Sequence, residues 1–221
     1  MADVNAPGRR YLSPRRQQTA QQTRRAVLAA AQALFVERGY PATTIEQIAQ
    51  RAGVSKPTVF AAVGSKATVL KQLRDLALAG DEQPVPGAQR AWYQRALREP
   101  DPYRSLRLHA RNVTDIHQRS ADLHEVLRSA ATADPELAEL WHTSERERRT
   151  GAGSVVDALL RKGPLKAGLD RDSAIDLLWV LTSTVSFQSL VRTRGWPRHK
   201  YEQWLGDSFC QQLLPTPPAH R

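Results

Sequence analysis

The sequence of 221 residues has a single cysteine and no long apolar run that is free of polar groups. Because Cys210 is alone, no disulfide can form within the chain, which fits a reducing compartment such as the cytoplasm. Residues 1–25 are polar and arginine-rich and lack the apolar core of a secretory signal. The weakly charged stretch 175–191 is as long as a membrane span, but Asp176, Gln188 and its hydroxyl groups favour a buried helix. We therefore expect a soluble, cytoplasmic protein without membrane contact.

The sequence also lacks the patterns of a strand-rich fold and of an enzyme. No stretch alternates with the period of a β-strand, and no segment repeats. No serine, histidine and aspartate arrangement stands out, and residues 151–154 lack the third glycine and preceding strand of a dinucleotide loop. His109, His117, His124 and His142 fall on neighbouring predicted helices, but no cysteine or paired carboxylate lies at ligand spacing, which favours structural histidines over a metal site. We expect no catalysis, no metal and no cofactor.

Residues 44–63 have the pattern of two short helices joined by a tight turn. Thr44 and Gln47 fit a capping box at the start of the first helix, and Gly53 can adopt the left-handed conformation that ends it. Ser55 can cap the second helix, and Pro57 is tolerated in its first turn. Apolar residues recur at helical spacing: Ile45, Ile48, Ala49, Ala52, Val54, Val59, Phe60 and Val63. The pattern is typical of a helix-turn-helix, with an ordinary helical hairpin in a core as the alternative.

The positive charge is concentrated in the same part of the chain. Residues 1–80 contain twelve lysines and arginines but only four acidic residues, which accounts for +8 of the formal net charge of +10. The remaining residues are nearly neutral. A basic helical module attached to a neutral body fits a polyanionic partner such as DNA, whereas a merely solvated basic surface would not explain the asymmetry.

The whole pattern predicts an all-α protein with a small N-terminal domain and a larger C-terminal domain. We expect a disordered basic arm over 1–16, a helix-turn-helix domain over 17–64 and a connecting helix over 65–80. Two prolines and a glycine within 81–87 mark the domain junction. The larger domain spans 88–214 and is followed by a tail, 215–221. Its expected helices are 88–98, 102–119, 121–132, 135–160, 172–192 and 197–214.

Short motifs between residues 20 and 73 carry a family resemblance. They are Thr23-Arg24, Leu34-Phe35, Arg38-Gly39-Tyr40, Thr44-Ile45, Ile48-Ala49, Ala52-Gly53-Val54-Ser55, Thr58-Val59-Phe60, Gly64-Ser65-Lys66 and Leu70. In this order they resemble the tetracycline-repressor (TetR) family of bacterial transcription regulators, while the rest of the chain agrees with that family in helix count alone. The resemblance implies a homodimer that binds a palindromic operator and releases it when the larger domain binds a small-molecule effector.

The sequence departs from this family at two positions of the second helix of the motif. The family commonly has tyrosine where this chain has Phe60, and a histidine or tyrosine followed by phenylalanine where it has Ala62 and Val63. Phe60 has no hydroxyl group for a phosphate, and Ala62 offers neither a hydrogen bond nor an aromatic contact. Phosphate anchoring is therefore expected to depend more on backbone amides, Thr58, Lys66 and the arginine arm.

The predicted DNA contacts follow from the chemistry of the residues at the motif. Lys56 can donate to guanine or to phosphate, Thr58 can contact either, and the methyl groups of Ala61 and Ala62 can meet thymine. Lys66 lies at the start of the next helix, where its charge suits a phosphate. The full predicted DNA-binding set is Thr44, Ser55, Lys56, Thr58, Phe60, Ala61, Ala62 and Lys66. Arg10, Arg15 and Arg16 fit either minor-groove contact or plain disorder.

The larger domain offers candidates for effector binding and for dimerisation. The candidate effector-binding residues are Asn112, Trp141, His142, Trp179, Ser183 and Phe187, with Trp92, Thr182 and Ser186 beside them. The alternative for each of them is a filled core. The expected dimer interface uses Leu177, Leu178, Leu181, Val185, Leu205, Phe209 and Leu213 of the last two helices.

We predict from these features a sequence-specific, DNA-binding transcriptional regulator, released from its operator by an effector in the manner of a repressor. The rival class is an all-helical enzyme or small-molecule carrier whose basic N-terminal region binds something other than DNA. The charge asymmetry and the helix-turn-helix spacing favour the regulator. The sequence specifies neither the effector nor the operator.

Overall fold

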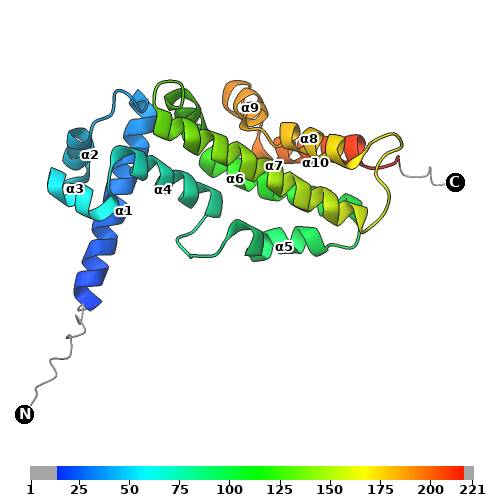
Figure 1. Cartoon of the computed structure of the whole chain (residues 1–221), viewed down its shortest axis with the longest axis horizontal. Coiled ribbons are helices and arrows are strands. Elements are labelled where there is room, and N and C mark those ends of the chain that lie inside the picture. Colours follow the sequence, from blue (N-terminus) through cyan, green and yellow to red (C-terminus); the bar gives the residue numbers. More distant parts are fainter. Residues whose placement is uncertain (1–13, 217–221) are drawn as a thin grey trace, which may run out of the picture. The chain divides into compact units, whose positions relative to one another are not determined.

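The computed structural model describes residues 14–216, and all regular structure within that range is helical (Figure 1). The all-α prediction is therefore confirmed. The chain divides into a first compact unit that ends at Leu70 and a second that begins at Lys71. This division lies inside a helix, whereas residues 81–86 lie in the loop that follows this helix and Gly87 begins a 3-10 turn. The expected arm over 1–13 and the end of the tail over 217–221 lie outside the described residues.

The first unit contains α1 (Pro14–Arg38), α2 (Ile45–Ala52), α3 (Lys56–Val63) and the start of α4 (Lys66–Ala79). The helix expected from residue 17 begins three residues earlier, at Pro14, so residues 14–16 are helical and not part of a disordered arm. Both halves of the predicted capping box are present. The Thr44 side chain accepts from the Gln47 backbone at 3.2 Å, and the Gln47 side chain accepts from the Thr44 backbone at 3.0 Å.

The core of the first unit joins α1 to the two helices of the motif. Val27, Ala31 and Leu34 of α1 are buried, as are Ile48 of α2 and Val59 of α3. Burial of such side chains is the main source of stability for short helices, because eight-residue helices like α2 and α3 are marginal by themselves. Packing against α1 therefore fixes the orientation of both motif helices.

The second unit begins within α4 and continues through eight further elements. They are the 3-10 turn η1 (Gly87–Gln89), α5 (Ala91–Arg98), α6 (Pro102–Ala130), α7 (Pro135–Leu160), α8 (Arg171–Leu181), α9 (Thr184–Phe187), the π-helical η2 (Gln188–Thr193) and α10 (Arg198–Leu213). The predicted N-cap at Asp134 is confirmed, since its carboxylate accepts from the backbone amides of Glu136 and Leu137. In the core of this unit, α10 packs against α6, and α8 packs against α7.

Two expected helix boundaries of this unit are wrong. The separate helices expected over 102–119 and 121–132 form the single helix α6, because no glycine or proline interrupts the chain at the buried Ser120. Conversely, the single helix expected over 172–192 stops at Leu181. The Thr182 hydroxyl donates to the Leu178 carbonyl at 2.9 Å, and the Ser183 side chain accepts from the Val185 backbone amide, which caps a new helix. Hydroxyl groups that bond to the backbone in this way destabilise or bend a helix, and at an N-cap they start a new one.

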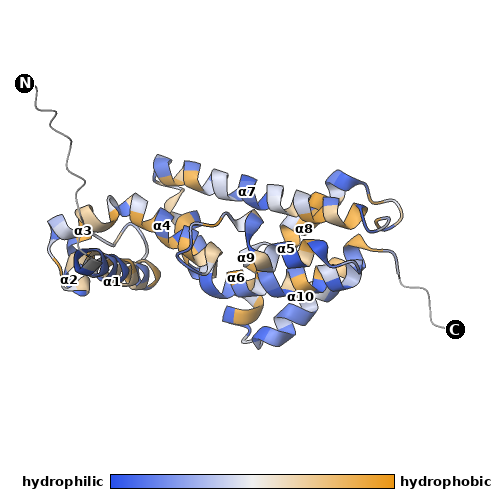
Figure 2. Ribbon diagram, turned by 90° about the horizontal axis from the view of Figure 1, so that it is seen from below, coloured by the Kyte–Doolittle hydropathy of each residue, from blue (hydrophilic) through white to orange (hydrophobic). Residues whose placement is uncertain are grey.

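The segment Arg171–Thr193 is long and apolar enough to cross a membrane by length and composition, and the apolar colouring of α8 is visible in Figure 2. Only 22% of its most apolar window is buried within the protein. The segment is nevertheless broken into three helical pieces and packs on α7 and α10, so it is not a membrane span. It leaves apolar side chains at the surface, with Val180 59% and Val185 64% exposed.

Candidate nucleic-acid interface

The second helix of the motif, α3, has one buried face and one exposed face. Val59 and Val63 are buried in the core of the first unit, whereas Lys56 and Ala61 are exposed. Phe60, which was expected in the apolar face, is instead 47% exposed. A large aromatic side chain at the surface of a helix that also carries a lysine is available for contact with a partner. The exposed face of α3 therefore contains three of the predicted DNA-contacting residues.

The start of α3 is fixed by its cap. The Ser55 side chain accepts from the Thr58 backbone amide at 3.3 Å, and the two hydroxyl groups lie 2.7 Å apart. The preceding turn is set by Gly53, which has a φ of 68° in the left-handed region. Both features were predicted from the sequence and are confirmed. Ser55 is thus occupied in part by its own helix, and the first turn of α3 is held rigidly at the surface.

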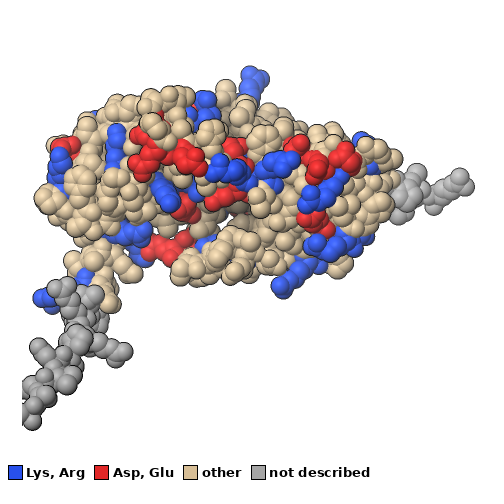
Figure 3. Space-filling model, in the orientation of Figure 1, with Lys and Arg blue, Asp and Glu red and all other residues tan. Residues whose placement is uncertain are grey.

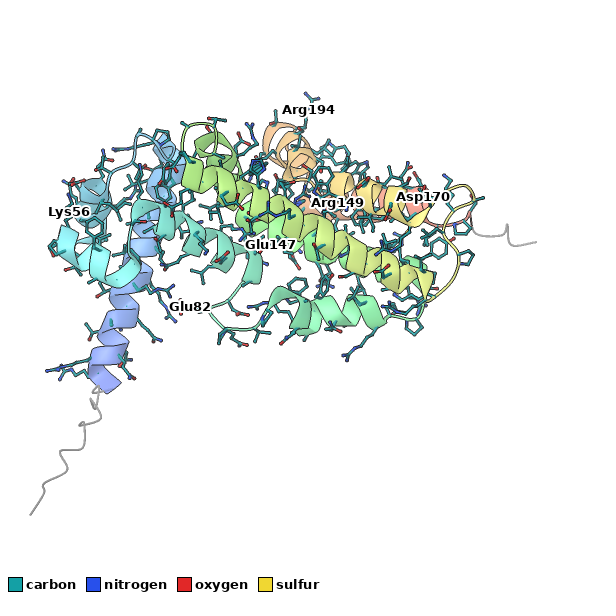
Figure 4. All side chains as sticks on the ribbon, viewed as in Figure 1. Lys56, Glu82, Glu147, Arg149, Asp170 and Arg194 are labelled. Atoms are coloured by element: carbon teal, nitrogen blue, oxygen red, sulfur yellow. The ribbon has the colours of Figure 1, made fainter. Side chains whose placement is uncertain are left out.

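Lys56, labelled in Figure 4, forms an ion pair with Glu46 of α2. Its hydrogen bond is the main reason that the pKa of the Glu46 carboxyl lies below its ordinary value. Both side chains are more than half exposed, and ion pairs in that environment are weak because water and salt screen them. Lys56 can therefore exchange Glu46 for a DNA acceptor at little cost.

Lys66 has a partner that the sequence did not reveal. Its ammonium group donates to the carbonyl oxygens of Tyr40 and Thr43, at 2.9 Å each, and lies 4.1 Å from the centre of the Tyr40 ring. These contacts tie the start of α4 to the turn that precedes α2. Lys66 thus has a structural role within the first unit, and its contact with a phosphate stays a prediction.

The remaining predicted DNA contacts lie on or beside the same motif. Thr44 is exposed at the N-terminus of α2, while Thr58 and Ala62 are half-buried on α3. A bidentate ion pair between Arg51 and Glu37, at 2.6 and 2.8 Å, fastens α2 to α1. All eight predicted residues therefore lie in the first unit, and the side chains of Lys56, Phe60 and Ala61 are exposed on α3.

The six candidate effector-binding residues differ in their surroundings, and their contact with an effector stays a prediction. His142 is exposed, and the buried Asn112 donates from Nδ2 to the Trp92 carbonyl at 3.1 Å. Trp179 and Phe187 instead border a polar network at the break between α8 and α9. Ser183 caps α9 at that break, and the Trp141 ring lies 4.7 Å from that of His124.

This network centres on two residues that were not among the predicted effector contacts, Arg148 and His117. Arg148 donates to the Trp179 carbonyl at 3.0 Å, and its guanidinium lies 5.3 Å from the Trp179 ring centre. His117 Nε2 lies 3.1 Å from the Thr182 carbonyl, which can only accept, so this nitrogen carries the proton. The other ring nitrogen then accepts from the Tyr201 hydroxyl at 3.3 Å.

Burial controls the protonation of this network. It lowers the pKa of His117 to about 3 and that of His124 to about 4, and it raises the pKa of Tyr201 to about 12. Both imidazoles and the phenol are therefore neutral at pH 7. No group of three metal-binding side chains gathers anywhere within residues 14–216.

The expected dimer interface is largely wrong in its residues. Leu178, Leu205, Phe209 and Leu213 are fully buried in the core of their own chain and cannot also face a second copy. Leucine spacing alone could not separate the face of α10 that packs on α6 from an outer face. The exposed apolar side chains of this region are those of Val180 and Val185, next to the half-buried Leu177 and Leu181.

The arrangement of α1, α2 and α3 matches known proteins. Residues 27–73 match the family model described as bacterial regulatory proteins of the tetR family. YdeS of Bacillus subtilis (strain 168), an HTH-type transcriptional regulator, is 31% identical over 159 residues, which cover 71% of this chain and 74% of YdeS.

Solved structures share the fold over most of the chain. NalD, the secondary repressor of the MexAB-OprM multidrug efflux pump in Pseudomonas aeruginosa, matches with a TM-score of 0.64 at 22% identity, covering 88% of this chain and 98% of NalD. SmeT in complex with triclosan matches with a TM-score of 0.68 at 20% identity, covering 87% of this chain and 91% of SmeT.

The exposed face of α3 and the fold around it define a sequence-specific, DNA-binding transcriptional regulator of the helix-turn-helix class. More particularly, the chain belongs to the TetR family of bacterial regulators. Membership of this family places the protein in solution in the cytoplasm, where its DNA target lies.

Proposed function

We propose that this regulator is an effector-released repressor that binds a palindromic operator as a homodimer and has no catalytic role. The two-sided character of α3 is the observation that carries the DNA-binding part. Its buried valines hold the helix in place, and its exposed Lys56, Phe60 and Ala61 meet the major groove. Two copies related by two-fold symmetry would present two such helices to two half-sites.

A pair of alanine substitutions tests this use of α3. Ala61 lies on the exposed face of α3, and Ala29 is equally an exposed helical alanine, on α1. Ala61→Glu should abolish binding to a duplex selected by the wild-type protein, because it adds a negative charge where DNA would lie. Ala29→Glu makes the same chemical change elsewhere in the unit and should bind nearly as well as the wild type. Equal binding by both variants would contradict the assignment of α3.

The effector part of the proposal rests on the network at the α8–α9 break. Trp179 Nε1 is buried and has no acceptor among the described residues, and the Arg148 guanidinium lies over the same ring. An aromatic ligand with a hydrogen-bond acceptor would satisfy the indole and pack beside Trp141 and Phe187. SmeT binds triclosan, and a regulator from Saccharomonospora viridis of the same fold binds choline, which supports a small-molecule site in this domain.

Tryptophan fluorescence tests this site with two probes, triclosan and choline. Triclosan is aromatic and carries oxygen acceptors, so we expect it to quench the fluorescence saturably and to weaken DNA binding. Choline, a cation, should do neither beside Arg148. Arg148→Met should weaken the triclosan response without affecting DNA binding in the absence of the probe. If Arg148→Met responds to triclosan as the wild type does, the proposal that the effector binds beside Arg148 is contradicted.

A further inference from the structure

The N-terminal turns of α1 project from the first unit without packing against it. Residues 15–22 are exposed on every side, and the first buried residue of α1 is Val27 (Figure 1). We call residues 14–26 the α1 extension. At 1.5 Å per residue it is about 20 Å long, and its first turns, residues 15–22, have no buried side chain to stabilise a polar helix in water. The fold of the unit itself therefore does not explain why the helix continues this far.

The composition of the α1 extension limits what it can bind. Between Asp3 and Glu37 the chain has six arginines and no acidic residue, four of them in the α1 extension. In Figure 3 the projecting end of α1 shows basic side chains and no acidic ones. Its only apolar residues are Pro14, Ala20 and Ala26, so it has no anchor for an apolar pocket and none for insertion into a lipid bilayer. Glutamine, threonine and arginine side chains are suited to a polyanion.

The helical repeat shows which residues of the α1 extension lie on the same side of α1 as its buried residues. Val27, Ala31 and Leu34 lie three or four residues apart on the side of α1 that is buried in the core with α2 and α3. The same spacing, continued toward the N-terminus, passes through Thr23, Ala20 and Arg16. This stripe is exposed or half-exposed because the core ends before it. It continues the side of α1 that is buried in the core of the first unit, to which α2 and α3 both contribute.

We propose that the α1 extension is a second DNA-contacting surface that follows the phosphate backbone flanking each half-site, through the stripe of Arg16, Ala20 and Thr23. This inference rests on the proposed function, because it takes α3 as the element that reads the operator. A helix is too wide for the minor groove of B-DNA, which is about 6 Å across, so the extension contacts phosphates and not base edges there. Such contacts add affinity and salt dependence but no sequence preference.

The experiment uses the full chain and an operator selected by it, in two duplex lengths. One duplex ends at the selected half-sites, and the other has about six further base pairs on each side, matching an extension about 20 Å long. The wild type should bind the longer duplex about two- to tenfold more tightly, with a salt slope steeper by about two units if one phosphate is contacted per chain in a dimer.

Two pairs of variants locate the contact. Ala20→Glu should remove the gain from the flanks, whereas Ala29→Glu, the same exposed change on the opposite side of α1, should keep it. Arg16→Gln should reduce the salt slope, and Arg98→Gln on α5 should not, although it removes the same charge from an exposed helix. Circular dichroism confirms that all four variants retain the fold.

The outcomes separate this inference from the proposed function. If the wild type binds the selected operator but the flanks add nothing, or if Ala20→Glu behaves as Ala29→Glu does, the α1 extension does not contact DNA while the role of α3 stands. If the wild type prefers no DNA sequence at all, the proposed function fails first. A gain from the flanks that only Ala20→Glu and Arg16→Gln diminish supports the inference.

Discussion

At the scale of single residues, the polar side chains of the motif divide between holding the module together and facing outward. Lys66 illustrates the difference, because its position beside the motif suggests a phosphate contact while its ammonium group serves two carbonyl oxygens of the preceding turn. The chemistry of a lysine is the same in both roles. What decides between them is a tertiary contact that joins residues more than twenty positions apart.

Replacement of Lys66 by methionine tests these roles against each other. Lys66→Met keeps most of the apolar stem and removes the donors to Tyr40 and Thr43, so we expect a loss of about 1–3 kcal/mol in the free energy of unfolding of the first unit. Urea unfolding measures that loss. If the stability is unchanged and only the salt dependence of DNA binding falls, Lys66 anchors phosphate instead.

His117 makes the stability of the second unit depend on pH. Its pKa is lowered to about 3 by burial, against about 6.5 in an unfolded chain, so the unfolded state binds one more proton between these values. The contribution to stability is complete above pH 6.5 and is lost progressively as the pH falls toward 3. The slope for one proton is about 1.4 kcal/mol per pH unit.

Replacement of this histidine should weaken that pH dependence. His117→Asn should lower the proton uptake on unfolding by about one at pH 5, which urea unfolding at a series of pH values measures. His142→Asn removes a histidine from the surface and is the matched control. A slope that does not change in His117→Asn would show that the group is not the buried, neutral imidazole described here.

At the scale of elements, the parts of the fold that could be predicted are those encoded by local contacts. The caps at Thr44 and Ser55, the turn at Gly53 and the proline starts of α6 and α7 each depend on residues within four positions. The two motif helices and their caps were therefore predicted correctly, whereas the exposure of Phe60 was not expected and the DNA contacts of the eight residues stay predictions.

Other parts of the fold could not be predicted, because the local sequence pattern is compatible with more than one structure. The break at Thr182 and Ser183 occurs inside an apolar run. From the sequence, the hydroxyl groups there fit the surface of one continuous helix as well as they fit a break. The buried leucines of α10 have the same spacing whether their partner is α6 or a second chain. The Glu46 and Tyr40 partners of the two lysines are tertiary as well, and no spacing in the sequence indicates them.

Replacing glycine by alanine should change the free energy of unfolding in opposite directions at Gly53 and Gly151, because their backbone conformations differ. Gly53 has a φ of 68°, so Gly53→Ala should cost about 1 kcal/mol although a Cβ there meets no atom within 4 Å. Gly151 lies inside α7, without a positive φ and with the same open space, so Gly151→Ala should stabilise by about 0.5–1 kcal/mol. The midpoints of urea unfolding should move in opposite directions, and a shift of the same sign would contradict these backbone assignments.

At the scale of the whole molecule, the dimer proposal depends on the apolar surface that a single chain leaves exposed. Val180 and Val185 are more than half exposed on or beside α8. Val180→Asp combined with Val185→Asp should give a folded monomer in sedimentation experiments and weaken operator binding. Leu205→Asp is the contrast, because it places a charge in the core and should unfold the second unit. A double variant that remains a dimer would place the interface elsewhere.

The central claim is that paired α3 helices read two equivalent half-sites, and selection of bound sequences from a random duplex library tests it most directly. The wild-type protein should recover a single class of sites whose two halves are related by two-fold symmetry, with centres about one helical turn apart or a multiple of it. Recovery of unsymmetric single sites, or of no preferred sequence, would contradict the account.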